Sequence, residues 1–297
     1  LHDLSQSCSL FPWTLIAARA CKMTDDKKPA WKSQRHGSGN AQGRFSKTKG
    51  KPRPRRPGLP PEGPVLLYGL HTVEAAFANK DRKRLKLYAT ENAKNRLQER
   101  GVIIDVPVED KRPKELDRMV TKDAVHQGMI LEADPLPAYG AEHLKGARLI
   151  LALDQVTDPH NVGAILRSAV ALDADAVVTT ERHAPEEGPV LAKSASGALD
   201  MIKHVRVKNM ARFITEMKEQ GFGCIALDSD GSASLEDTDF TEKTVLVLGS
   251  EGKGVRQGVR AACGLLARLD MPGEIRSLNV SNAAVLSLYV ARQKMGL

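Results

Sequence analysis

The sequence predicts an α/β protein in which a small α/β domain precedes a larger domain built on a parallel sheet. Short runs that are apolar on successive residues, such as 149–153 and 245–248, recur between helical segments in the second half of the chain. Such runs are typical of strands buried on both faces of a parallel sheet. Residues from about 24 to 63 contain little that a core could bury, and we expect residues 1–63 to form a disordered basic arm.

The positive charge of the chain is concentrated in this arm. Residues 22–56 contain twelve Lys and Arg against two Asp, a charge of +10, whereas the whole chain carries +8. Such an arm can hold phosphates through sequence-independent electrostatics, or it can be only a solubilising or targeting tail. The sequence leaves both alternatives open.

Residues 1–22 form a separate segment at the start of the arm. Residues 9–20 have the apolar character of a signal peptide, but Asp3 stands where a basic residue is expected. A translated upstream stretch with the true start at Met23 and an organellar transit peptide are the alternatives.

The composition otherwise indicates a cytoplasmic protein without a membrane anchor or a metal. No run of 18 or more residues is apolar throughout, so we predict no membrane span. The histidines form no HExxH-like cluster and the cysteines no CxxC pair, which predicts reduced thiols and no structural metal. The four cysteines are Cys8, Cys21, Cys224 and Cys263.

Residues 64–136 alternate between strand-like and helix-like segments, which predicts a small sheet flanked by helices. The expected strands are 65–69, 85–89, 102–108 and 128–133, and the expected helices lie around 73–77, 91–100 and 114–120. Four basic residues before the second strand can hold RNA or form a solvated turn: Lys80, Arg82, Lys83 and Arg84. Residues 137–147 are predicted to be a linker.

Residues 148–297 repeat this alternation on a larger scale. The expected strands are 147–154, 176–180, 204–207, 222–228, 244–249 and 265–271. The expected helices are 161–172, 188–199, 210–220, a short helix before the last strand and a final apolar helix. Because ligands bind at the carboxyl ends of strands in open α/β sheets, the loops that follow these strands are the candidate site.

The first such loop leads into the helix that begins near Asp158 and Pro159. We expect Asn161 to lie in the loop and Arg167 to lie one turn inside the helix. Taken alone, Arg167 is more typical of a helix-surface or salt-bridge arginine.

The second and third loops are rich in glycine and in polar side chains. Gly249, Gly252 and Gly254 surround Glu251 in a turn that is neither a GxGxxG fingerprint nor a Walker A loop. In the third loop a Pro-Gly turn is followed by polar residues within 276–282. Helix capping explains Ser281 or Asn282 singly, but not the whole cluster.

In this order, the three segments resemble the motifs of the SpoU or TrmH family of RNA ribose 2′-O-methyltransferases, within the SPOUT group. The motifs are Asn161-Val-Gly163-x-x-x-Arg167, Gly249-x-Glu251-Gly252-x-Gly254 and Ser277-Leu278-Asn279-Val280-Ser281. The resemblance covers 148–297. Residues 65–135 resemble a ribosomal-protein-like substrate-binding domain, and 68–77 with 124–130 are similar to the branch that methylates a guanosine of large-subunit rRNA.

The resemblance implies a homodimer that binds RNA and takes its methyl group from S-adenosylmethionine. It also implies a trefoil knot in the carboxyl-terminal domain, which is an exception to the rule against threading. The residues expected to bind the donor are Gly249, Gly254, Leu269, Met271 and Leu278. Where many members have Pro, this chain has Asp270, which either contacts the donor or faces solvent.

The resemblance assigns the catalytic role to Arg167, Asn161, Glu251, Ser277 and Asn279. The family gives activation of the hydroxyl to Arg167, but a guanidinium is rarely deprotonated in a protein. We therefore expect Arg167 to bind the adjacent phosphate and to stabilise the developing alkoxide, with Glu251 as its partner. The sulfonium of the donor is already a good leaving group, so the chemistry requires no metal.

Three other functions fit parts of the pattern. One is a tRNA ribose 2′-O-methyltransferase, and another is a non-catalytic RNA-binding or ribosome-assembly factor with the same fold. The third, a nucleotide-dependent oxidoreductase, lacks a dinucleotide fingerprint. The separate amino-terminal domain favours rRNA over tRNA.

Overall fold

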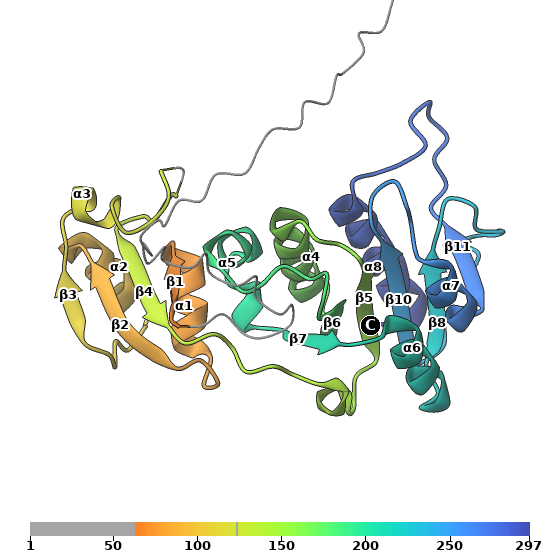
Figure 1. Cartoon of the computed structure of the whole chain (residues 1–297), viewed down its shortest axis with the longest axis horizontal. Coiled ribbons are helices and arrows are strands. Elements are labelled where there is room, and N and C mark those ends of the chain that lie inside the picture. Colours follow the sequence, from red (N-terminus) through yellow and green to blue (C-terminus); the bar gives the residue numbers. More distant parts are fainter. Residues whose placement is uncertain (1–62, 123) are drawn as a thin grey trace, which may run out of the picture. The chain divides into compact units, whose positions relative to one another are not determined.

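The computed structural model of the chain describes residues 63–122 and 124–297 (Figure 1). The predictions for the arm, for residues 1–22 and for Cys8 and Cys21 lie outside the described residues. Within the described ranges, every helix is too short or too polar to cross a bilayer.

The first part of the described chain forms a four-stranded mixed sheet with the order β1-β4-β2-β3. Its central strand β4 is antiparallel to β1 and β2, whereas β3 is parallel to β2. The strands are β1 (Val65–Tyr68), β2 (Arg84–Ala89), β3 (Val108–Asp110) and β4 (Met129–Ala133), and the helices are α1 (Leu70–Ala78), α2 (Glu91–Glu99) and α3 (Pro113–Leu116).

The strand expected over 102–108 is wrong except for its last residue, Val108. Val102, Ile104 and Val106 still pack against the core, as the alternation suggests, but residues 102–107 make no ladder. Pro107 has no N–H to donate to a ladder, and its carbonyl accepts from Leu87 N at 3.0 Å. The helix expected over 114–120 is shorter and ends at Leu116.

The second part forms a seven-stranded sheet with the order β7-β6-β5-β10-β8-β11-β9, in which every neighbouring pair is parallel. The predicted α/β class with a parallel sheet is confirmed. The strands are β5 (Leu149–Asp154), β6 (Ala176–Thr180), β7 (Lys203–Val207), β8 (Gly223–Leu227), β9 (Ala233–Ser234), β10 (Thr244–Gly249) and β11 (Leu265–Arg268). The two-residue strand β9 was not predicted.

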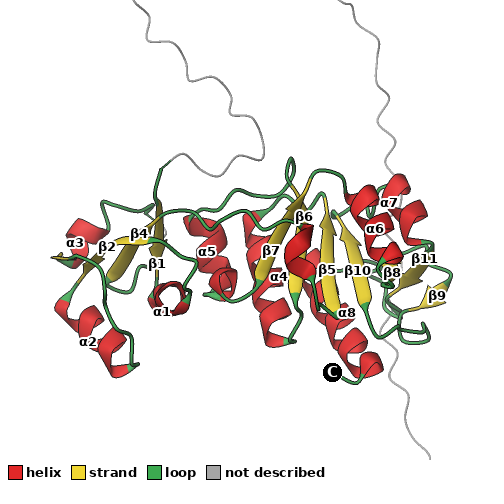
Figure 2. Ribbon diagram, turned by 90° about the horizontal axis from the view of Figure 1, so that it is seen from below, coloured by secondary structure: helices red, strands yellow, loops and turns green. Residues whose placement is uncertain are grey.

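Helices cover both faces of this sheet (Figure 2). Helices α6 and α7 pack on one face, and α4, α5 and α8 pack on the other. The helices are α4 (Pro159–Ala171), α5 (Pro189–Ala195), α6 (Met210–Glu219), α7 (Gln257–Cys263) and α8 (Val280–Met295), with short 3-10 helices η1 (Ala141–Leu144) and η2 (Ala198–Asp200).

Two helix starts differ from the sequence prediction, because the capping residues lie elsewhere. Asp158 caps α4 by accepting from His160 N at 3.1 Å, so Asn161 lies in the first turn of the helix and not in the loop. Asn279, rather than Ser281 or Asn282, caps α8.

The helix expected over 188–199 is broken. Ser196 and Gly197 adopt φ values of 50° and 95°, which end α5 before η2 begins.

The prediction that Arg82 forms part of an RNA-binding or solvated turn is wrong. The residue is 1% exposed, and its guanidinium pairs with Asp200 of η2 and with Glu187, which precedes α5. The same guanidinium donates to Asp134 O at 3.1 Å, and Glu187 Oε2 accepts from Leu136 N at 2.8 Å. Both buried carboxylates therefore have donors, which a buried ion pair needs in order to be tolerated.

Residues 137–147 contain η1 and an additional contact with the larger sheet. Tyr139 forms a β-bridge with Val205, and its carbonyl accepts from Arg206 N at 3.1 Å. Apolar residues of the small sheet, α5 and one face of the larger sheet also join in one buried cluster. The division into two domains with a linker between them stays a prediction.

Candidate active site at the carboxyl edge of the larger sheet

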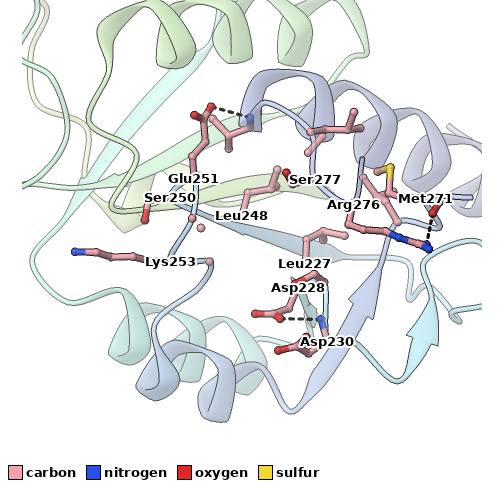
Figure 3. Close-up of a pocket in the computed structure, with 18 of the residues that line it drawn as sticks. Leu227, Asp228, Asp230, Leu248, Ser250, Glu251, Lys253, Met271, Arg276 and Ser277 are labelled. Atoms are coloured by element: carbon pink, nitrogen blue, oxygen red, sulfur yellow. Dashed lines mark hydrogen bonds between the residues drawn. The ribbon is translucent and has the colours of Figure 1, made fainter. Parts of the chain in front are cut away.

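A cavity of about 420 Å³ opens where β8, β10 and β11 end. This volume lies within the range of small-molecule sites. The five residues predicted to bind the donor all line it, as do Glu251 and Ser277 (Figure 3). Their roles in binding and catalysis stay predictions at this point.

One wall of the cavity is the glycine turn that follows β10. Ser250 and Gly254 form a β-bridge that folds the turn back on itself, and Gly252 and Gly254 have φ values of 78° and 64°. A Cβ at Gly249 would overlap the backbone of Gly254. The tight turn therefore requires glycine at 249, and backbone rather than side chains faces the cavity there.

The remaining walls combine aliphatic side chains with a few polar groups. The aliphatic lining consists of Leu227, Leu248, Leu269, Leu278, Val280 and Ala283. An apolar wall of this kind, beside exposed backbone, suits a flat heteroaromatic ring.

Arg276 and Asp228 fix the loops at the cavity edge. Arg276 Nη1 donates to Met271 O at 2.8 Å, which ties together the loop between β11 and α8. Asp228, at the end of β8, pairs with Arg260 of α7 at 3.3 Å. The sequence interpretation missed Asp228, although it directly follows a buried strand.

The three motif segments meet in one hydrogen-bond cluster made of Asn161, Glu251 and Asn279. Glu251 Oε1 accepts from Asn161 Nδ2 at 3.3 Å, from Asn279 Nδ2 at 2.7 Å and from Val280 N at 3.2 Å. Asn279 Nδ2 also approaches Asn161 Oδ1 at 3.0 Å. The cluster thus joins the first turn of α4, the glycine turn and the cap of α8.

Arg167 lies almost two turns further along α4 than Asn161 and does not line the cavity. Its side chain is exposed and has no hydrogen bond or ion pair with any other described residue. The expected pairing of Arg167 with Glu251 is wrong, because Glu251 is held by amide donors instead. The guanidinium is therefore available to a ligand.

Two acids beside the site have structural partners. Asp270 pairs with Arg268 Nε at 2.9 Å and does not line the cavity, which favours the solvent-facing alternative. Asp154, at the end of β5, is fully buried and accepts from Arg256 N at 3.0 Å and from its guanidinium. This pair raises the pKa of Arg256 and fixes the start of α7 directly after the glycine turn.

The cysteines of the described ranges are buried away from this cavity. Burial raises the pKa of Cys224 to about 11 and that of Cys263 to about 12, so both thiols stay protonated at neutral pH. No group of three or more His, Cys, Asp or Glu in residues 63–122 and 124–297 could hold a metal ion.

Comparison with known protein families gives two matches that together span most of the described chain. Residues 148–289 match the SpoU rRNA Methylase family. Residues 66–139 match the family described as RNA 2′-O ribose methyltransferase substrate binding.

Curated relatives match over nearly their whole length. The 23S rRNA (guanosine-2′-O-)-methyltransferase RlmB of Pseudomonas aeruginosa is 35% identical over 240 residues, which cover 77% of this chain and 96% of the relative. The protein of the same name from Neisseria meningitidis serogroup B is 31% identical, with 77% and 94% covered.

Solved structures share the fold. The SpoU methyltransferase AviRb from Streptomyces viridochromogenes, in complex with the cofactor AdoMet, has a TM-score of 0.68 at 24% identity and covers 78% of this chain and 91% of that one. An AdoMet-bound rRNA methyltransferase from Sinorhizobium meliloti has a TM-score of 0.66 at 22% identity, with 77% and 87% covered.

Proposed function

The chain belongs to the SpoU rRNA methylase family, and on that premise we propose that it transfers a methyl group from S-adenosylmethionine to a ribose 2′-hydroxyl of RNA. Its substrate is a guanosine of large-subunit rRNA, as the names of the relatives suggest. The observation that carries the proposal is the cluster of Asn161, Glu251 and Asn279 beside the cavity, which unites the three motif segments.

The cavity fits the proposed donor in its chemistry. Its leucine walls suit an adenine ring, and the glycine turn presents backbone groups that can read the ring edge. The requirement for glycine at 249 keeps that backbone accessible. S-adenosylmethionine carries the methyl group on a sulfonium sulfur. When the methyl group is transferred, the rest of the donor leaves as a neutral thioether.

Arg167 binds a phosphate next to the target ribose and stabilises the charge that develops on the ribose oxygen. The guanidinium stays protonated, so the hydroxyl proton leaves through the phosphate or through water. The absence of any partner for Arg167 among the described residues supports this role, because no internal ion pair must be broken first.

Glu251, Asn161 and Asn279 act by positioning. The carboxylate orients both amides and the first N–H of α8, and these in turn hold the glycine turn and the loop with Ser277 against each other. Correct placement of the reacting oxygen and the methyl group is itself a large part of catalysis.

We further propose that the protein is a cytoplasmic homodimer with a knotted carboxyl-terminal domain. Helix α8 leaves Val285, Leu286 and Tyr289 exposed, at 38%, 45% and 55%. Exposed apolar side chains gathered on one helix are a feature of protein interfaces. Sedimentation of the wild type and of Leu286→Glu tests this: a dimer that the charge splits is expected, and a monomeric wild type contradicts it.

The function is tested by transfer of radiolabelled methyl from S-adenosylmethionine to purified large-subunit rRNA and to bulk tRNA, with the product mapped for 2′-O-methylation. Label in rRNA that is absent with Arg167→Ala is the expected result. Label in tRNA alone supports the tRNA methyltransferase alternative. Donor binding without label in either RNA supports a substrate that is an assembling ribosomal particle, or the non-catalytic assembly factor.

A further inference from the structure

Lys193 of α5 lies close to Gly69 and Gln127, where α5 meets the small sheet, and we call this junction the recess. A methyl group added at Gly69, directly before α1, would lie 2.6 Å from Lys193 Nζ and 3.3 Å from Gln127 Oε1. Glycine at 69, with φ of 89°, therefore leaves the space that the ammonium occupies. The recess is formed by three segments that are distant in sequence.

The backbone around the recess is held in conformations that side chains rarely adopt. Gln127 has φ of 55°, and its Oε1 accepts from Leu70 N at 2.7 Å. Ser196 and Gly197, just after α5, also have positive φ. Strained residues of this kind persist where the surrounding structure fixes them, and they gather at functional sites.

The ammonium of Lys193 has no counter-ion within the described part of the chain. It has no hydrogen bond or ion pair there, although the side chain is half-buried. Lysines of the small domain, such as Lys83 and Lys94, pair with carboxylates. Burial lowers the pKa of Lys193, which reflects the cost of partial desolvation without a compensating anion. A bound anion would remove that cost.

The recess lies between the candidate RNA-binding domain and the hydrogen-bond cluster. Helix α5 packs closely on α4, because Gly163 leaves room for Ser194. Ser194 Oγ lies 3.2 Å from His160 Nδ1, and His160 directly precedes Asn161 of the cluster. Helix α5, which carries Lys193, therefore contacts both β1 of the small sheet and α4, the helix that carries Asn161.

We propose that Lys193 binds a backbone phosphate of the RNA substrate at the point where the strand passes from the small domain to the methyl-transfer site. This inference rests on the proposed function, and it adds a substrate-binding residue outside the three motifs. Gly69 and Gln127 shape the recess, whereas Lys193 makes the contact.

The test is the salt dependence of binding to unmodified large-subunit rRNA, measured without methyl donor. Lys193→Met keeps the aliphatic stem and removes the charge, and Lys193→Arg keeps the charge. Lys243→Met is the matched control, because Lys243 is exposed at the amino end of β10, opposite the carboxyl end where the cavity opens. S-adenosylmethionine binding by calorimetry is measured in parallel and is expected to be unchanged in all three variants.

For Lys193→Met we expect binding about fivefold to tenfold weaker, with the slope of log affinity against log salt reduced in size by about one. Lys193→Arg should restore most of the affinity, and Lys243→Met should match the wild type. If Lys193→Met and Lys243→Met bind alike while the wild type methylates rRNA, only this inference fails. If the wild type methylates no RNA, the proposed function fails, and an altered slope in Lys193→Met would still support a phosphate contact.

Discussion

Asn279 Nδ2 donates a hydrogen bond of 2.7 Å to Glu251 Oε1, while Asn279 Oδ1 caps α8 by accepting from Ser281 N at 2.9 Å. One amide therefore fixes the start of the last helix and also anchors the glycine turn. Because the same Glu251 oxygen also accepts from Asn161, any change at Glu251 affects the first turns of both α4 and α8.

Glu251→Ala should weaken both the fold and donor binding. It removes the acceptor of Asn161 Nδ2 and of the Val280 N–H, and one of the two acceptors of Asn279 Nδ2. Because Glu251 is solvent-exposed, we expect a loss of about 1 kcal/mol in the free energy of unfolding, together with a clear loss of donor affinity. Chemical denaturation and calorimetry measure the two effects. Glu219→Ala, at the end of α6, is the control, and equal donor affinity in both variants would contradict the positioning role.

Gly249→Ala should abolish donor binding. The new methyl group overlaps the backbone of Gly254, so the turn must open. Gly258→Ala in α7 is a matched control, because a Cβ there meets nothing within 4 Å and alanine favours a helix by about 0.5–1 kcal/mol. Calorimetric titration with S-adenosylmethionine should separate them, and retained binding in Gly249→Ala would show that the turn does not form the donor site.

Arg167→Ala should reduce methyl transfer by about a hundredfold or more without changing donor affinity. The side chain has no hydrogen bond or ion pair in the described ranges and does not line the cavity, so we expect its loss to affect RNA contact rather than the donor site. Single-turnover kinetics measure the rate of methyl transfer, and calorimetry separately measures the affinity for the donor. If Arg167→Lys keeps most of the activity with a flat pH–rate profile, a general positive charge rather than the guanidinium is what matters.

Arg82→Met should destabilise the protein strongly. Asp200 and Glu187 would remain buried without their cationic partner, a situation that costs about 3–5 kcal/mol. Denaturant unfolding measures the loss. The triple variant Arg82→Met, Asp200→Asn, Glu187→Gln should recover part of it, because no uncompensated charge remains. Equal stability of the single and triple variants would argue against this electrostatic explanation.

Stability should fall as the solution is acidified, through His204. Burial and the charge of Arg206 lower the pKa of His204 from 6.5 to about 3, and its Nε2 lies 2.9 Å from Thr179 Oγ1. Below pH 6.5 His204 therefore binds a proton in the unfolded chain but not in the folded chain. The contribution of His204 to the free energy of unfolding is fully present above pH 6.5 and declines towards pH 3. Between pH 7 and pH 5 the free energy of unfolding should fall by about 2 kcal/mol for this reason. The free energy of unfolding should depend more steeply on pH in the wild type than in His204→Gln. The same pH dependence in both proteins would show that His204 is not responsible.

The sequence pattern predicted most of the larger sheet and the glycine turn after β10, because both depend on neighbouring residues. Buried runs mark β5 and β10, and the glycines of 249–254 mark the turn. The resemblance supplied Leu269 and Leu278, which no periodicity singles out. Family membership, now established, confirms that resemblance.

The predictions that failed depend on partners distant in the chain. Arg82 looks like a surface residue beside Lys80 and Lys83, and only the fold brings Asp200, 118 positions away, to its guanidinium. Glu251 has two candidate partners in the first motif, and only the geometry of α4 selects Asn161 over Arg167. Local pattern carries no information on such choices.

The pairing of β5 with β10 has a consequence for how the chain reaches its native state. Thr244 lies opposite Leu149 and Gly249 opposite Asp154, so these adjacent inner strands meet only after nearly a hundred intervening residues have been brought into place. Closing a segment of that length carries a high entropic barrier, and proteins rich in such distant pairings fold slowly. The cavity stands on the carboxyl end of β10, one of these two late-pairing strands. We expect the ability to bind the donor to appear in the slowest refolding phase, well after the small sheet has formed.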